Sequence, residues 1–201
     1  MEGTQLELVI LILVSILILM NFIVILYNNG SLRKIIRWLR DYFSQNRAQN
    51  IINAISNISE AAIELSDNKK GSIIAIQTKD ELTNLFMNAQ ELNADINANL
   101  IINIFGGEES QPLHDGALVI SNNKITMANA FVKKLTTSKI DKKYGARHRA
   151  AIGLSEQSDA VVIITSEERK GISLAYGGKI NVIPDEEIFD VLSEYLLKNI
   201  R

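Results

Sequence analysis

The feature that most constrains this chain is an uninterrupted apolar segment near its N-terminus. Between Leu8 and Tyr27 every residue is apolar except Ser15 and Asn21. A helix of roughly 20 residues spans about 30 Å, the thickness of the hydrocarbon core of a bilayer. A buried core helix is the alternative interpretation, but the length of the segment and the charges on one side of it favour a membrane span. We therefore expect a transmembrane anchor over residues 1–30.

The charges around this segment predict its orientation. A cleaved signal peptide would begin with basic residues, whereas this N-terminus carries Glu2 and Glu7 and no cationic side chain. Four basic residues follow the span closely, namely Arg33, Lys34, Arg37 and Arg40. Because basic residues stay on the cytoplasmic side, we expect a single-pass protein of the cell membrane with all later residues in the cytoplasm.

Residues 31–47 form an amphipathic pattern that predicts a connector helix capped by Ser31 after a break at Asn28-Asn29-Gly30. Its apolar positions recur at helical spacing and are Leu32, Ile35, Ile36, Leu39 and Tyr42 or Phe43. This stripe either lies in the membrane interface, with Trp38 at headgroup depth, or pairs with the same helix of a second chain. A further helical pattern from Ile51 ends at Ser66-Asp67-Asn68, and we place a separate domain at 48–201.

Composition narrows the class of this domain. A chain of 201 residues with 47% hydrophobic side chains has enough apolar surface for one core. The net charge of -2 and the pI near 5.8 give no overall basic field, so we expect no nucleic-acid partner. The absence of cysteine excludes disulfides and thiolate metal sites.

Short apolar runs alternate with helical patterns beyond residue 70, which predicts an α/β domain built on one central sheet. The predicted strands are Ser72–Ile76, a hairpin of 117–120 with 125–128, Ala160–Thr165, 172–175 and 179–183. We expect a helix over 80–90 and a last helix capped by Asp185. The segment 98–105 reads equally as a helix or a strand end.

Three polar segments could carry chemistry. His114 and Asp115 offer an imidazole and a carboxylate before a strand, with Gly116 allowing close backbone approach, although a solvated turn would have the same composition. Arg147-His148-Arg149 could hold phosphate oxygens or be an exposed, ion-paired segment. Ser166-Glu167-Glu168 follows the strongest predicted strand, where it could bind a ligand or cap a helix.

Taken together and in this order, these segments resemble the diadenylate cyclase domain. The resemblance spans about 51–183 and rests on Asp115-Gly116-Ala117 within Pro112–Ala117, on Arg147-His148-Arg149 within 145–153, and on Ser166-Glu167-Glu168 with Gly171. One spanning helix before the domain is similar to the single-pass membrane cyclases of bacteria, the CdaM type. The resemblance implies a central mixed sheet flanked by helices.

The resemblance also implies an activity, a nucleotidyl transfer that joins two ATP molecules into cyclic di-AMP, a second messenger, and releases two pyrophosphates. Each 3′-hydroxyl would attack the α-phosphate held by the facing protomer, so a homodimer is required. The implied catalytic residues are Asp115, Arg147, His148 and Arg149. The implied ATP-binding residues are Gly116, Ala117, Phe131, Val132, Arg147, Arg149, Ser166 and Glu167, with His148 also holding phosphate. The implied ligands of a divalent metal (Mn²⁺, Mg²⁺ or Co²⁺) are His114, Asp115 and Glu168.

Ala146 departs from the family pattern, which usually has threonine before Arg-His-Arg. If that hydroxyl donates to a phosphate, its loss weakens nucleotide binding by roughly 0.5 to 1.5 kcal/mol. Two other functions fit the same residues less well. A non-catalytic nucleotide sensor has no need of Asp115, and a membrane scaffold would not depend on His114, Asp115 or Arg147.

Overall fold

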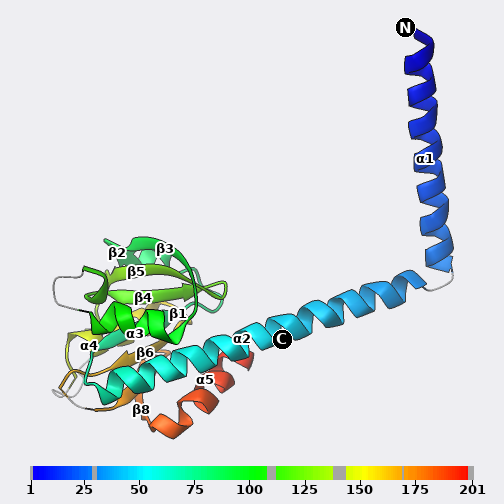
Figure 1. Ribbon diagram of the computed structural model, residues 1–201. Coiled ribbons are helices and arrows are strands. Elements are labelled where there is room, and N and C mark those ends of the chain that lie inside the picture. Colours follow the sequence, from blue (N-terminus) through cyan, green and yellow to red (C-terminus); the bar gives the residue numbers. More distant parts are fainter. Residues whose placement is uncertain (1, 29–30, 108–111, 138–143, 169, 199–201) are drawn as a thin grey trace. The chain divides into compact units, whose positions relative to one another are not determined.

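The computed structural model describes residues 2–28, 31–107, 112–137, 144–168 and 170–198 (Figure 1). The chain forms two compact units, 1–48 and 49–201. Helix α1, Glu2–Asn28, contains the 21-residue stretch Gln5–Ile25, which is long and apolar enough to cross a membrane and is not buried by the rest of the chain. Of the predicted break after this helix, residues 29 and 30 lie outside the described residues.

Helix α2, Ser31–Asp67, joins the two helical patterns that the sequence indicated separately. No glycine or proline interrupts residues 31–67, and both patterns have the period of an α-helix, so one helix accommodates them. The boundary between the compact units falls inside this helix, between Ala48 and Gln49. The second half of α2 is buried through Ile55, Ile58 and Leu65.

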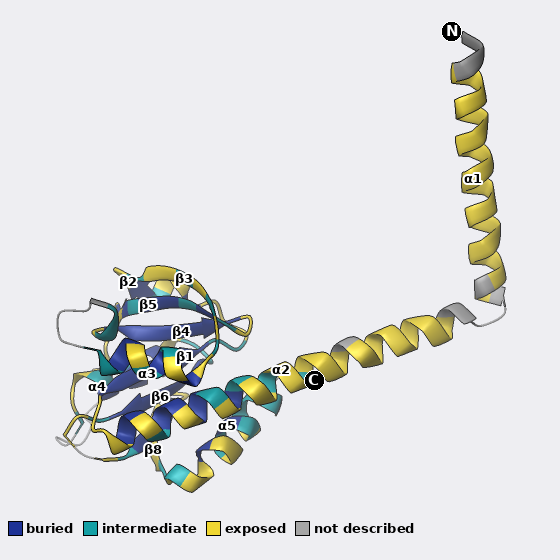
Figure 2. Cartoon of the chain, in the orientation of Figure 1, coloured by how far each residue is buried: buried dark blue, intermediate teal, exposed yellow. Residues whose placement is uncertain are grey.

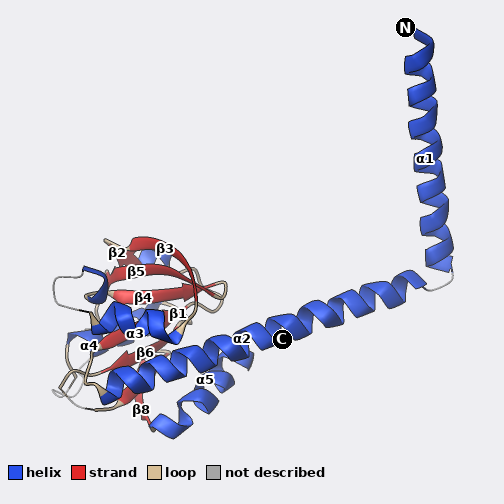
Figure 3. Cartoon of the chain, viewed as in Figure 1, coloured by secondary structure: helices blue, strands red, loops and turns tan. Residues whose placement is uncertain are grey.

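The second unit is built on a mixed sheet of eight strands (Figure 3). The strands are β1 Ser72–Ile76, β2 Phe86–Met87, β3 Gln90–Asp95, β4 Ala117–Ser121, β5 Lys124–Val132, β6 Val161–Thr165, β7 Ile172–Tyr176 and β8 Lys179–Ile183. Their order is β2-β5-β4-β1-β6-β7-β8, with β3 also paired to β5. Strand β1 is parallel to β4 and antiparallel to β6. The predicted α/β fold with a central mixed sheet is confirmed.

Helices cover both faces of this sheet, and the strands beneath them are largely buried (dark blue in Figure 2). Alternate residues of a strand point to opposite faces, so Ile74 and Ile76 pack with α2, α3 (Ala98–Gly106) and α5 (Ile188–Leu197). Ile73 and Ala75 pack instead with α4, Ala146–Gln157. All five residues of each of β1, β4 and β6 are buried, as expected for strands covered on both faces.

Two local predictions are wrong. The predicted helix over 80–90 is a 3₁₀ turn, Thr83–Leu85, followed by β2 and β3, because both segments pair with β5 one after the other in the same direction. Asn88, between them, adopts a φ of 56°. Leu82 and Phe86 are buried as helical spacing suggested, but Phe86 pairs with Val132 of β5. Asp185 does not cap the last helix, since it begins a 3₁₀ turn, Asp185–Glu187, that precedes α5.

The ambiguous segment 98–105 is helix α3, whose N-terminus is capped by Asn97 accepting a hydrogen bond from the Leu100 backbone N–H at 3.2 Å. The predicted hairpin is β4 and β5, joined by Asn122 and Asn123 with φ of 51° and 60°. Asparagine tolerates this left-handed backbone, which two-residue hairpin turns require. Strand β5 continues to Val132, beyond the predicted end at Ala128.

Candidate functional site

The register of the sheet brings the polar segments to one edge. Ile74 of β1 pairs with Leu118 of β4, and Ser72 of β1 pairs with Thr165 of β6. The start of β1, the start of β4 and the end of β6 therefore lie at the same edge. Two of these are the amino ends of parallel strands, so the rule that ligands gather at the carboxyl ends of parallel strands does not describe this site.

The first group of site residues precedes β4. A 3₁₀ turn, Pro112–His114, places His114 Nε2 at 3.2 Å from Asp115 Oδ1. The Asp115 side chain is 62% exposed and that of His114 is 18% exposed, so the carboxylate is the more open to a ligand. The two form a ready donor pair for a cation.

Gly116 is required by the sheet itself. A Cβ at this position would overlap the backbone of Asn129 and Ala130 in β5. Asn129 has a φ of 52° and lies where the register between β4 and β5 shifts. The glycine therefore lets two backbones approach, whereas the sequence had indicated approach to a ligand.

The second group surrounds the N-terminus of α4. A cavity of about 220 Å³ is lined by Gly145, Ala146, Arg147, His148, Thr165, Ser166, Glu167 and Glu168. The first backbone N–H groups of a helix have no partner within the helix and carry a partial positive charge. Such an end favours phosphate, and here it opens into a cavity that also contains a guanidinium and a hydroxyl.

Arg147 is held in place and still has donors to offer. Its Nη1 donates to Glu167 Oε1 at 2.8 Å, and its side chain is 25% exposed. Its Nε is buried and makes no hydrogen bond within the described chain. Gly71 lies directly beneath it, since a Cβ there would come within 2.6 Å of Arg147 Nη1. A buried donor without an acceptor is costly, so an oxygen of a bound ligand would satisfy it.

His148 is buried, at 9% exposure, and its ring lies 5.0 Å from that of Tyr144. Burial lowers the pKa of His148 below its ordinary value, and the nearby Glu168 carboxylate opposes part of that shift. His148 is therefore neutral near pH 7 and offers an imidazole ring rather than a positive charge.

Arg149 does not line this cavity. Residues two apart on an α-helix point about 200° from one another, so Arg147 and Arg149 project from opposite sides of α4. Arg149 is exposed. The two guanidiniums on either side of His148 therefore do not face the same cavity within one chain.

The metal ligands that the resemblance implied are likewise not together. No three carboxylate or imidazole side chains gather into a metal-binding group within the described part of the chain. His114 and Asp115 precede β4, whereas Glu168 follows β6, and β1 lies between these strands. Neighbouring strands are about 4.8 Å apart, so the start of β4 and the end of β6 are separated by roughly 10 Å.

Phe131 and Val132, expected to cover the adenine, face different ways. Val132 is 7% exposed and belongs to the core with Phe86 and Ile152. Phe131 is 37% exposed. Of the two, only the Phe131 side chain is open to a ligand.

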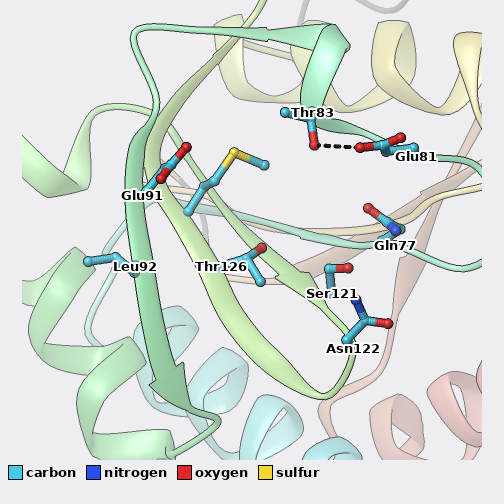
Figure 4. A pocket seen from close by; sticks show the side chains of 9 residues that line it. Gln77, Glu81, Thr83, Glu91, Leu92, Ser121, Asn122 and Thr126 are labelled. Carbon is cyan, nitrogen blue, oxygen red and sulfur yellow. Dashed lines mark hydrogen bonds between the residues drawn. The ribbon is translucent and has the colours of Figure 1, made fainter.

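A larger cavity of about 510 Å³ lies apart from these polar segments (Figure 4). It adjoins the β4–β5 turn, at the other end of β4 from Asp115, and is lined by Gln77, Glu81, Thr83, Glu91, Leu92, Ser121, Asn122, Thr126 and Met127. None of these described residues is basic and two are carboxylates, an environment that repels a triphosphate.

Sequence reasoning missed several contributors. Gly71 lies beneath Arg147, and Thr165 lines the cavity. Tyr144 contacts His148. Lys170 lines an adjoining cavity of about 160 Å³ with Tyr144, His148, Ser166, Gly171, Ser173 and Val182. Gly71 immediately precedes one predicted strand and Thr165 is the last residue of another. Their position would have indicated a shared site had the strand pairing been known.

A helix N-terminus, an anchored arginine with a spare donor, a hydroxyl and carboxylates define a phosphate-binding α/β domain. The comparisons identify the family. The family model "DisA bacterial checkpoint controller nucleotide-binding" matches residues 59–180. A diadenylate cyclase of Mycoplasma pneumoniae is 30% identical over 190 residues, 94% of this chain and 93% of its own length.

Solved structures agree. A double mutant of DacA from Staphylococcus aureus has a TM-score of 0.67 and 34% identity over 72% of this chain and 95% of its own. A protein from Bacillus cereus described as a hypothetical membrane spanning protein has a TM-score of 0.61 and 40% identity over 64% and 62%. The chain belongs to the diadenylate cyclase family.

Proposed function

We infer that this protein condenses two ATP molecules into cyclic di-AMP and two pyrophosphates. The observation that carries the inference is the meeting of the family's Asp-Gly-Ala and Arg-His-Arg segments at one sheet edge, where Arg147 has a buried donor to spare. Family membership over 59–180 supplies the reaction.

The phosphates of one ATP are proposed to bind at the N-terminus of α4. There Arg147 and the first backbone N–H groups would neutralise charge, Ser166 would donate its hydroxyl, and neutral His148 would add one hydrogen bond. Glu167 would fix Arg147 while contacting the nucleotide. Gly116 and Ala117 would border it, and Phe131, with the Val132 backbone, would contact the adenine.

The reacting groups are proposed to come from two protomers. Each 3′-hydroxyl would attack the α-phosphorus on the facing nucleotide, forming a P–O bond as the bond to pyrophosphate breaks. Asp115 would support loss of the hydroxyl proton. Arg149, which points away from Arg147, would act on the phosphates from another direction than Arg147 does. A two-fold axis makes both halves of this reaction equivalent.

The family generally uses divalent metals. His114 and Asp115 offer a nitrogen and an oxygen donor that suit Mn²⁺ or Co²⁺ and, through the carboxylate, Mg²⁺. Glu168, which follows β6 on the other side of β1 from Asp115, would supply a further carboxylate oxygen to such an ion. Such an ion would polarise oxygen atoms and neutralise phosphate charge.

We also propose that α1 anchors the protein in the cell membrane with the catalytic unit in the cytoplasm. The length and composition of Gln5–Ile25 and the basic residues that follow it support this arrangement. ATP is available on that side.

The test is the Asp115→Asn variant of the full chain, incubated with ATP and Mn²⁺ and assayed for cyclic di-AMP by mass spectrometry. Loss of the carboxylate charge at constant shape should lower synthesis at least about 100-fold, since proton removal and cation binding both depend on it. Asp95→Asn is the matched control, because Asp95 pairs with Lys124 at the other end of the sheet. Normal synthesis by a folded Asp115→Asn protein would remove Asp115 from the mechanism.

A further inference from the structure

The first half of α2 presents an apolar stripe that the chain leaves exposed. Ile35, Ile36, Leu39 and Tyr42 are 45%, 57%, 39% and 51% exposed. At 100° per residue these four fall within an arc of about 120°. Trp38 is 63% exposed, stacks on Tyr42 with ring centroids 5.7 Å apart, and borders the same arc.

Basic charge is concentrated beside this stripe. Residues 31–47 contain five basic side chains and one acidic side chain, Asp41, whereas residues 48–201 contain 16 basic and 20 acidic ones. The basic residues are Arg33, Lys34, Arg37, Arg40 and Arg47. An amphipathic helix with this charge is complementary to a surface that is apolar below and anionic above.

A paired coiled coil requires a longer apolar seam than the sequence provides. Beyond Phe43 the next residues on the same face are Asn46, Asn50 and Asn53. The apolar seam therefore covers less than two heptads, whereas coiled coils sustain about three or four. One buried asparagine is tolerated in such a seam, but three in succession remove its apolar contact.

Chain length places the start of α2 at the membrane surface. Helix α1 ends at Asn28 and α2 begins at Ser31, so the two ends are three Cα steps, or at most about 11 Å, apart. The headgroup layer on each side of a bilayer is roughly 5 to 8 Å thick. If α1 spans the membrane, the first turn of α2 begins at or just beyond the headgroups.

We propose that residues 31–43 lie along the cytoplasmic membrane surface and bind anionic lipid headgroups, with Trp38 at headgroup depth. This inference rests on the proposed anchoring by α1. The arginines and the lysine bind lipid phosphates while Ile35, Ile36 and Leu39 enter the acyl boundary. The lipid surface thereby sets where the catalytic unit begins.

Trp38 is the only tryptophan of the chain, so its fluorescence reports on this helix alone. The full chain is reconstituted in lipid nanodiscs of phosphatidylcholine with and without about 30% phosphatidylglycerol, each with and without brominated acyl chains. We expect blue-shifted emission and bromine quenching that are about twofold stronger in the anionic discs. Replacing Arg33, Lys34, Arg37 and Arg40 with glutamine should remove that difference.

The matched control replaces four exposed lysines of the second unit, Lys70, Lys79, Lys134 and Lys179, with glutamine and should retain the full effect. Unquenched Trp38 in chains that co-purify with the discs would overturn the proposal, and cross-linking between Trp38 positions would then assign the stripe to a second copy. Chains that fail to enter the discs would refute the anchor, on which the proposal rests. Cyclic di-AMP synthesis measured in the same discs tests the proposed activity independently.

Discussion

Arg147 is the residue whose geometry most directly supports ligand binding. Glu167 uses one of its donors and Gly71 leaves room beneath it, yet its buried Nε has no acceptor in the described chain. Because unsatisfied buried donors are rare in folded proteins, this Nε supports the proposal that Arg147 binds an anion. Its neighbour His148 is neutral, because burial lowers the pKa of the imidazole.

The depressed pKa of His148 predicts how stability responds to pH. Below about pH 6.5 the unfolded chain binds a proton that the folded chain resists, so this contribution is complete above that value and declines as the pH falls. Thermal unfolding at pH 7.5 and 5.5 should show a smaller decline for His148→Gln than for the unchanged protein. His114→Gln, the matched control, should retain the decline due to His148. An equal decline in all three would contradict the assignment.

Gly116 should tolerate no side chain. Gly116→Ala places a Cβ against the β5 backbone and should lower the free energy of unfolding by about 3 kcal/mol, the upper part of the usual range for overpacking. Gly106→Ala is the control, because nothing lies within 4 Å of a Cβ there. Chemical denaturation measures both. Equal stability of the two variants would show that β5 can move away from Gly116.

Among the secondary-structure elements, the sequence predicted those with an uninterrupted local signal. Four consecutive apolar residues, 73–76, predicted β1, and five, 160–164, predicted β6. Asn122-Asn123 predicted the β4–β5 turn. The segment 80–90 was mistaken for a helix because Leu82, Leu85 and Phe86 have helical spacing, which a 3₁₀ turn followed by a strand also accommodates. Local spacing carries no information on such long-range pairing.

For the same reason the sequence predicted candidate site residues but not their grouping. That β1 separates Asp115 from Glu168 depends on strand order, which joins residues far apart in the chain. That Arg149 points away from Arg147 follows from helix geometry once Ala146–Gln157 is known to be helical.

The Asp159 carboxylate, just before β6, is hydrogen-bonded to the turn after β1. Asp159 accepts hydrogen bonds from the Lys79 and Asp80 backbone N–H groups at 3.3 and 3.0 Å. Partial burial raises the pKa of Asp159, but hydrogen bonds with Thr78, Asp80 and Lys79 together lower it below its ordinary value. The ionised form is therefore the one that stabilises the fold.

Asp159→Asn should lower the free energy of unfolding at pH 7 by about 1 kcal/mol, because an amide oxygen accepts these bonds less strongly. The stabilisation is present above the unfolded pKa of about 3.9 and is lost as the pH falls through the lower folded value. Denaturation curves of the two proteins should therefore differ at pH 7 and come closer together at pH 3. A constant difference at both pH values would point to packing instead of charge.

For the whole molecule, the division of the metal and phosphate groups across β1 leaves each chain without a three-ligand metal site among its described residues. Residues 49–201 form a compact unit with its own core. If the reaction needs two facing protomers, this fragment should lose rate per molecule as it is diluted.

Synthesis by residues 49–201 should therefore rise with nearly the square of protein concentration below the dimer dissociation constant. The full chain in membranes should be less sensitive to dilution, because anchoring concentrates it. Initial rates across a hundredfold range of protein concentration measure the exponent. A strictly linear dependence, with analytical ultracentrifugation showing monomers, would contradict the two-protomer mechanism.

The position of β1 between β4 and β6 also fixes the spacing of the two strand ends next to the functional groups. The start of β4 and the end of β6 are two strand spacings apart, and backbone hydrogen bonds fix this distance. An extended nucleotide is long enough to reach from one of these strand ends to the other. A point mutation that replaces a side chain at either end leaves this strand spacing unchanged.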